Sequence, residues 1–272
     1  MKSKSVLVAT DLSARCDRPV DRALALAEQL HAVAEILHVV EPNDKARDES
    51  EVRMRVVATL PGEVSQPEIL IVPGAVPETI ARITEERGSA LIVTGVARHN
   101  NVGDYFLGTA VDYIVRNAKV PVLVVKQRPH APYTKLLIAT DLSSCSRQAL
   151  VAAGELFSDA VLHVVHAYQV PFETRLTSEG VRKEVHEMAQ RDLDAFVNDP
   201  EMPAALRGRI QARLDYGETG EVIAKALRET NADLVVLGTH GKSGFVHATI
   251  GSQAESLLLW LPVDTLMVRE QT

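Results

Sequence analysis

Short hydrophobic runs alternate with longer amphipathic stretches along the whole chain. The runs are rich in Val, Ile and Leu and have the length of buried strands, whereas the stretches between them have helical periodicity. In the carboxyl-terminal half the pattern predicts strands at residues 136–139, 161–165, 209–214, 234–237 and 265–268, and helices at residues 147–157, 178–198, 220–229 and 249–261. Strands that alternate with helices are typical of βαβ crossovers, so the pattern predicts an α/β protein with parallel sheets.

The motif Ala-Thr-Asp-Leu-Ser occurs twice, at residues 9–13 and again at residues 139–143. In both places it follows a hydrophobic run that predicts the first strand of a unit. Two further similarities follow in the same order. One aligns residues 36–40 with residues 161–165 and sets His38 opposite His163; the other pairs Gly74 and Glu78 with Gly217 and Glu221.

Collinear similarities of this kind predict a duplication. We expect one domain over residues 1–128, with five strands ending at residues 122–125, and a second over residues 133–272. The polar, proline-containing segment 127–132 is the predicted linker. Right-handed crossovers place the ligand crevice of such a domain at the carboxyl ends of the strands, where the strand order reverses.

A glycine-rich segment follows the fourth predicted strand of the second domain. It contains Gly238, Gly241 and Gly244, and a Gly-Ser step at Gly251 and Ser252 opens the next predicted helix, which gives the spacing Gly-x2-Gly-x9-Gly-Ser. Glycines let the backbone approach an anion closely, and the first amides of a helix donate to phosphate oxygens. The segment therefore predicts a phosphate site, to which Lys242 adds a positive charge; a tight turn selected for packing is the alternative.

Two other nucleotide motifs do not match the chain. A P-loop requires a glycine five positions before Gly241, where Val236 stands inside a predicted strand. No Gly-x-Gly-x-x-Gly follows the first strand of either domain, so a nicotinamide-dependent enzyme is not predicted.

The spacing of Gly238, Gly241 and Gly251-Ser252, together with the residues 139–141 that end the first strand, resembles the ATP-binding subgroup of the universal stress protein family. The resemblance extends over nearly the whole chain, twice. It implies an α/β fold of two tandem Rossmann-like domains, each a five-stranded parallel sheet with helices on both faces.

The resemblance also implies the site residues. Adenine is expected against the main chain near Val164 and Val165, and Asp141 close to the ribose and phosphates. The glycines and Ser252 would hold the phosphates, with Gln253 offering the next amide. The complete set of expected nucleotide-binding residues is Ala139, Thr140, Asp141, Val164, Val165, Gly238, His240, Gly241, Lys242, Ser243, Gly244, Gly251, Ser252 and Gln253.

The first domain departs from this pattern. It has Gly95, then Arg98 where the second domain has Gly241, then Gly108 and Thr109. A bulky side chain at a glycine position disfavours positive φ and fills the phosphate space, although a guanidinium can itself bind phosphate. We expect ATP in the second domain, and expect the first domain mainly to pair with the second through their last strands.

These observations favour an ATP-binding regulatory protein of the stress response, in which the nucleotide acts as a conformational or assembly signal. A slow ATPase with magnesium and a nucleotide-free interaction scaffold are the alternatives. For hydrolysis, Asp141 and His240 are candidates for a general base by location only. Further assembly into a homodimer is also expected.

Composition narrows the choice of partners and compartment. A formal net charge of −7 gives no general attraction to nucleic acid or anionic lipid. No stretch reaches the roughly 20 apolar residues of a spanning helix, so we expect a cytoplasmic protein. The two cysteines, Cys16 and Cys145, are expected to be reduced thiols, and the isolated histidines His38, His163 and His166 do not predict a metal site.

Overall fold

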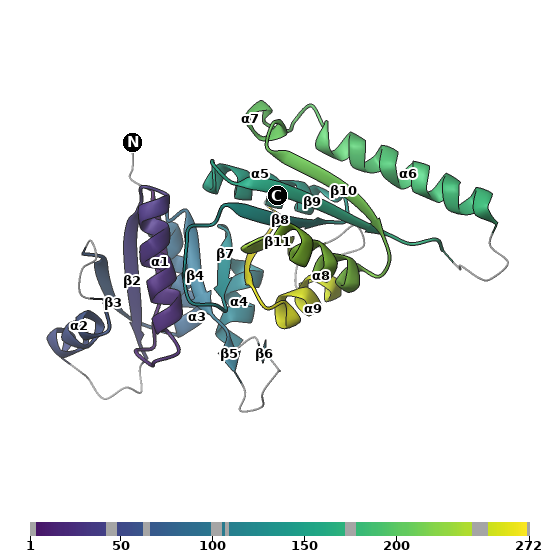
Figure 1. The fold of residues 1–272 in the computed structure, drawn as a ribbon. Helices are drawn as coiled ribbons and strands as arrows, with labels where there is room; N and C mark the ends of the chain where they lie inside the picture. The colour runs from purple at the N-terminus through teal and green to yellow at the C-terminus, as the bar shows by residue number, and fades with distance from the viewer. Residues whose placement is uncertain are drawn as a thin grey trace.

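A ten-stranded sheet runs through the computed structural model, which describes residues 4–41, 48–61, 66–98, 105–106, 109–171, 178–240 and 250–270 (Figure 1). The amino-terminal half contributes β1 (Ser5–Ala9), β2 (Val33–Val40), β3 (Glu68–Pro73), β4 (Leu91–Gly95) and β7 (Val122–Val125). The carboxyl-terminal half contributes β8 (Lys135–Thr140), β9 (Val161–Tyr168), β10 (Ile210–Tyr216), β11 (Leu234–Gly238) and β12 (Asp264–Val268). Within each half the strands are parallel, in the orders β3-β2-β1-β4-β7 and β10-β9-β8-β11-β12.

Helices cover both faces of this sheet. They are α1 (Asp17–Gln29), α2 (Glu49–Ala58), α3 (Val76–Arg87), α4 (Thr109–Asn117), α5 (Ser144–Leu156), α6 (Glu179–Val197), α7 (Ala204–Arg207), α8 (Thr219–Thr230) and α9 (Ser252–Trp260). One hydrophobic core lies under α1, α2, α5 and α6, and a second lies under α3, α4, α8 and α9. Successive strand residues enter opposite cores, as Val6 and Leu7 do, because side chains alternate along a strand. The predicted fold class, with a parallel sheet and helices on both faces in each half, is confirmed.

A small hairpin between β4 and α4 was not predicted. It pairs β5 (Ala97–Arg98) antiparallel with β6 (Tyr105–Phe106), with Arg98 opposite Tyr105. Strands of two residues are too short to produce a hydrophobic period, so the sequence pattern gives no signal for them. Arg98 lies in β5 with an extended backbone, so its φ is not positive.

The strand register corrects one predicted equivalence between the halves. Ala9 pairs with Leu37, and its counterpart Ala139 pairs with Val165. His38 is therefore equivalent to His166, and the predicted match of His38 with His163 is wrong by three residues. Short hydrophobic runs resemble each other in several alignments, whereas main-chain pairing with the neighbouring strand fixes a single one.

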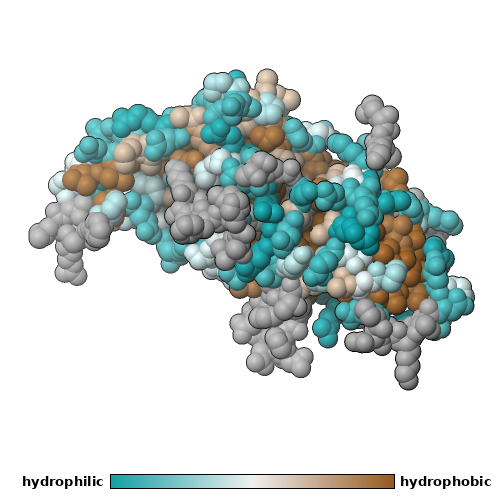
Figure 2. All heavy atoms as spheres, turned by 180° about the vertical axis from the view of Figure 1, so that it is seen from behind, coloured by the Kyte–Doolittle hydropathy of each residue, from teal (hydrophilic) through white to brown (hydrophobic). Residues whose placement is uncertain are grey.

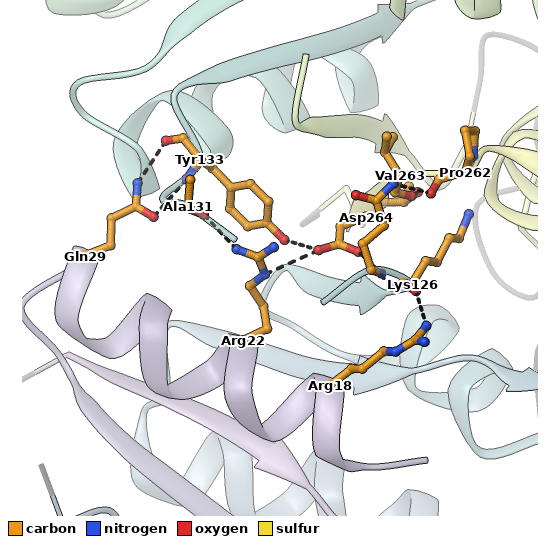
Figure 3. A network of polar contacts seen from close by, with 11 residues as sticks. Arg18, Arg22, Gln29, Lys126, Ala131, Tyr133, Pro262, Val263 and Asp264 are labelled. Carbon is orange, nitrogen blue, oxygen red and sulfur yellow. Dashed lines mark hydrogen bonds and ion pairs between the residues drawn. The ribbon is translucent and has the colours of Figure 1, made fainter. Parts of the chain in front are cut away.

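The two halves meet where β12 pairs antiparallel with β7, with Leu266 opposite Leu123. The predicted linker lies beside this junction and packs against α1. Arg22 donates from Nη1 to the carbonyl of Ala131 at 3.1 Å. Gln29 donates to the carbonyl of Tyr133 at 2.9 Å and accepts from its amide at 3.2 Å (Figure 3). The segment is polar, as predicted, but these bonds fix it in one place.

On the face of the molecule seen in Figure 2 most coloured atoms are hydrophilic, with brown hydrophobic areas near both ends of the view. In the part of the chain whose burial is described, the exposed large hydrophobic residues are Val33, Met54, Val57, Val181, Met188, Tyr216 and Trp260. Among the described residues, no helix combines the length and the apolar character that crossing a membrane requires.

Candidate functional site

A cavity of about 250 Å³ opens at the carboxyl ends of β8, β9 and β11, between α8 and α9. β8 lies between β9 and β11, so the strand order reverses at this point, where open α/β sheets bind ligands. The cavity is lined by Ala139, Thr140, Asp141, Ser146, Val165, His166, Ala167, Thr219, Ile223, Leu237, Gly238, Thr239, His240, Gly251, Ser252, Gln253, Ala254 and Leu257.

Local hydrogen bonds shape the turn after β8. Thr140 Oγ1 accepts from the amide of Leu142 at 2.9 Å, and Asp141 Oδ1 accepts from the amide of Ser143 at 3.1 Å. Leu142 has φ of 64°, which is unfavourable for a branched side chain, so the two side-chain bonds stabilise a strained turn. Asp141 therefore has a structural role in addition to lining the cavity.

The first half contains the same turn. Thr10 accepts from the amide of Leu12 at 3.0 Å and Asp11 accepts from that of Ser13 at 2.8 Å, while Leu12 has φ of 60°. Burial acts to raise the pKa of Asp11, but hydrogen bonds from Ser13 and Cys16 lower it overall. The turn chemistry thus belongs to both copies.

The amino end of α9 forms the polar wall of the cavity. Gly251 is the N-cap, without a side-chain cap, and its own amide donates to the carbonyl of Thr239 at 2.8 Å. The amides of Ser252 and Gln253, in the first turn, have no intrahelical acceptor. Such amides, with the positive end of the helix dipole, attract an anion.

The side chains of Thr239 and His240 complete this wall. Thr239 Oγ1 lies 2.8 Å from Nδ1 of His240, and the Thr239 amide donates to the carbonyl of Val268 at 2.9 Å. These bonds hold His240 at the end of β11, next to the amino end of α9.

Aliphatic side chains also line the cavity. Val165, Ile223, Leu237 and Leu257 all line the cavity and belong to the core beneath α8 and α9. His166 lines the cavity too, and its Nδ1 lies 2.8 Å from the carbonyl oxygen of Thr140. Because a carbonyl only accepts, Nδ1 carries the proton, and in the neutral ring Nε2 is the acceptor. A flat aromatic base suits such a surface.

Gly238 is explained by packing. A Cβ at this position would lie 2.9 Å from Cys145 Sγ and 3.2 Å from the amide nitrogen of Ser146, at the start of α5. In the first half a Cβ on Gly95 would lie 2.9 Å from Cγ of Pro19 in α1. Both glycines leave room for a helix that packs against the end of the strand. Packing alone therefore explains why Gly238 of the glycine-rich motif is a glycine.

The cavity brings together nine of the predicted site residues: Ala139, Thr140, Asp141, Val165, Gly238, His240, Gly251, Ser252 and Gln253. Val164 is not among its lining residues, because alternation along β9 places its side chain in the core on the opposite face of the sheet. Gly241, Lys242, Ser243 and Gly244 lie outside the described residues, as does Gly108.

Several lining residues were not in the predicted set: Ser146, His166, Ala167, Thr219, Ile223, Leu237, Thr239, Ala254 and Leu257. Thr219 and Ile223 are one helical turn apart at the start of α8, a spacing that places them on the same face. The second strand of this half was predicted to end at residue 165. In the structure β9 continues to Tyr168, so His166 and Ala167 belong to the strand end that borders the cavity.

The fold and the cavity together define a class: two tandem copies of a doubly wound α/β domain, with a ligand-sized cavity at the strand-order reversal of the second copy. The universal stress protein family model matches residues 2–126 and again residues 132–269. The chain belongs to the universal stress protein family.

Individual relatives agree with this assignment. A Staphylococcus aureus strain USA300 protein named for the same family is 28% identical over 144 residues, which is 51% of this chain and 86% of the relative. The crystal structure of a functionally unknown protein from Pseudomonas aeruginosa PAO1 has a TM-score of 0.68 at 21% identity and covers 98% of this chain and 92% of its own. A universal stress protein from Archaeoglobus fulgidus has a TM-score of 0.63 at 18% identity, with both chains fully covered. The two structures support the fold.

Proposed function

We propose that the carboxyl-terminal half binds an adenine nucleotide, ATP in particular, and that the bound nucleotide acts as a conformational or assembly signal in a stress response. The observation that carries this proposal is the amino end of α9, where Gly251 provides no side-chain cap and which lines a cavity that aliphatic side chains also line. A nucleotide likewise has a polar and an apolar part, with anionic phosphates at one end and an aromatic base at the other.

The described residues fit such a ligand. The cavity, at about 250 Å³, is close to the lower limit of small-molecule sites, which begin at about 300 Å³. Ser252 offers both a hydroxyl and an amide for phosphate, and His166 offers a ring acceptor. Asp141 also lines the cavity, and its carboxylate can accept from ribose hydroxyls.

Magnesium is the ion that commonly accompanies ATP. It is typically held by phosphate oxygens with one or two carboxylates, and Asp141 is the carboxylate among the described lining residues. With the ion bound, Asp141 would be its protein ligand, and the ion would neutralise phosphate charge. No group of three or more His, Cys, Asp or Glu suited to a metal occurs in the described part of the chain.

Calorimetric titration of ATP into matched variants tests the proposal. A hydrogen bond to a charged group contributes about 1.5–3 kcal/mol, so Ser252→Ala should weaken ATP binding about ten- to a hundredfold. Thr109→Ala changes the equivalent residue of the first half and should leave affinity unchanged. Gly241→Arg copies the first half into the second and should weaken binding more than Ser252→Ala.

Two further measurements separate the proposal from a nucleotide-free scaffold. Mass spectrometry should detect adenine nucleotide released on denaturing protein purified without added ligand. One solved universal stress protein is described as a complex with cAMP, so cAMP should be titrated beside ATP. No released nucleotide and no heat of binding would contradict the proposal, and two equivalent sites per chain would show that the glycine position does not determine occupancy. Light scattering tests for the proposed homodimer.

A further inference from the structure

Helix α9 connects the candidate nucleotide cavity to the other half of the molecule. Its amino end lines the cavity, and its carboxyl end lies against Lys126, the residue that follows β7. Lys126 Nζ donates to the carbonyls of Leu258 and Leu261 at 2.5 and 2.7 Å. The last carbonyls of a helix have no intrahelical donor and form the negative end of its dipole, so an ammonium group stabilises them.

Lys126 is itself fixed from two directions. It is buried, with 3% of its surface exposed. Its amide donates to Asp264 Oδ1 at 2.7 Å, and its carbonyl accepts from Nη1 of Arg18 in α1 at 2.9 Å. The other oxygen of Asp264 accepts from the Tyr133 hydroxyl and lies 3.3 Å from Arg22 Nε (Figure 3). The lysine therefore cannot shift without disturbing the junction of the two halves.

We propose that Lys126, from the amino-terminal half, is a positioning residue for the ligand cavity of the carboxyl-terminal half: by holding the carboxyl end of α9 it sets the place of the amino-end amides. The inference rests on the proposed function and adds to it a coupling between the cavity and the junction. Coupling is reciprocal, so a ligand at one end of α9 strengthens the contact at the other.

The charge on Lys126 makes this coupling sensitive to pH. Burial lowers the pKa of Lys126 to about 8, and nearby Asp264 opposes the shift only in part. The charged groups that the described contacts place around it include Asp264, Arg18 and Arg22, and arginine keeps its charge throughout. Burial raises the pKa of the neighbouring Tyr133 well above its usual value, so the lysine loses its proton first.

Affinity and stability should then respond to pH in opposite directions. Loss of the proton replaces charge-assisted hydrogen bonds with weaker ones and removes a positive charge that favours an anion, so ATP affinity should fall above about pH 8. The same deprotonation relieves the burial of a charge, so this group makes the fold more stable as pH rises. If Lys126 only stabilised the fold, ATP affinity would not fall with rising pH while stability increases.

The experiment is calorimetric titration of ATP at about pH 7 and about pH 9.5 into wild type, Lys126→Met, Lys126→Arg and the control Lys119→Met, an exposed lysine of the same half. Lys126→Met should bind ATP about three- to tenfold more weakly at the lower pH. Lys126→Arg keeps the charge and should lose the decline at the higher pH. Lys119→Met should match wild type throughout, and the wild-type pH series provides the test if Lys126→Met does not fold.

Hydrogen exchange of residues 255–260 in the ligand-free protein provides an independent measurement. Exchange should be at least about fivefold faster in Lys126→Met than in wild type or Lys119→Met. If wild type binds no nucleotide, the proposed function fails, and exchange still decides whether Lys126 holds α9. Wild-type affinity in Lys126→Met with a flat wild-type pH profile, or unchanged exchange in α9, would overturn the inference.

Discussion

Replacing Asp264 with asparagine should strongly destabilise the protein. The carboxylate is 1% exposed and accepts three hydrogen bonds, from the amides of Lys126 and Gln127 at 2.7 and 2.9 Å and from the Tyr133 hydroxyl. It also forms an ion pair with Arg22, whose Nε lies 3.3 Å away. Asparagine has nearly the same shape but no charge, and one of its two polar groups donates instead of accepting. The Asp264→Asn variant therefore leaves the Arg22 guanidinium, whose side chain is 6% exposed, without its counter-charge.

The size of the effect follows from burial. Breaking a buried ion pair from one side costs about 3–5 kcal/mol, since the remaining charge stays desolvated. Folded domains are stable by only about 5–15 kcal/mol, so the loss is a large share of the total. Tyr133 adds to it, because its ring packs under the Arg22 guanidinium at 4.3 Å and its hydroxyl would lose an anionic acceptor.

Urea unfolding followed by circular dichroism, with Trp260 fluorescence as a second probe, measures the change in the free energy of unfolding. The matched control is Glu86→Gln, which breaks an exposed pair with Arg82 and should cost less than about 0.5 kcal/mol. Adding Arg22→Met to Asp264→Asn should recover at least about 1 kcal/mol, because the guanidinium that lost its counter-charge is then removed as well. A cost below about 1 kcal/mol for Asp264→Asn, or no recovery in the double variant, would refute the reasoning.

Two further predictions concern packing and pH. Gly238→Ala should lower the unfolding free energy by about 1–3 kcal/mol, because the added Cβ would lie 2.9 Å from Cys145 Sγ. The control Gly208→Ala should cost much less, since a Cβ there would have nothing within 4 Å. Equal costs in urea unfolding would contradict this prediction. Lys126 has a pKa of about 8 when folded and about 10.4 when unfolded, so between these values the unfolded chain holds more protons and stability rises with pH. The difference in unfolding free energy between wild type and Lys126→Met should change by about 3 kcal/mol across that window. Urea unfolding at several pH values measures it, and a difference that stays constant would show that Lys126 does not titrate there.

The sequence by itself determined the duplication and the fold class, and it indicated nine of the residues that line the cavity. These features are local or repeated: hydrophobic period distinguishes strand from helix, and the motif at residues 9–13 and 139–143 marks the same turn in both halves. For the same reason the sequence alone indicates Ser252 and Asp141 as cavity residues, since each lies at a strand end or a helix start.

Only the tertiary structure decided which residues face one another. The equivalence of His38 and His166 and the burial of Val164 away from the cavity follow from main-chain register, which similar short runs leave open. The contact of Lys126 with α9 and the pairing of Asp264 with Arg22 join residues more than 130 positions apart. No local pattern marks a single charged residue as buried, because its burial depends on the partners that folding brings to it.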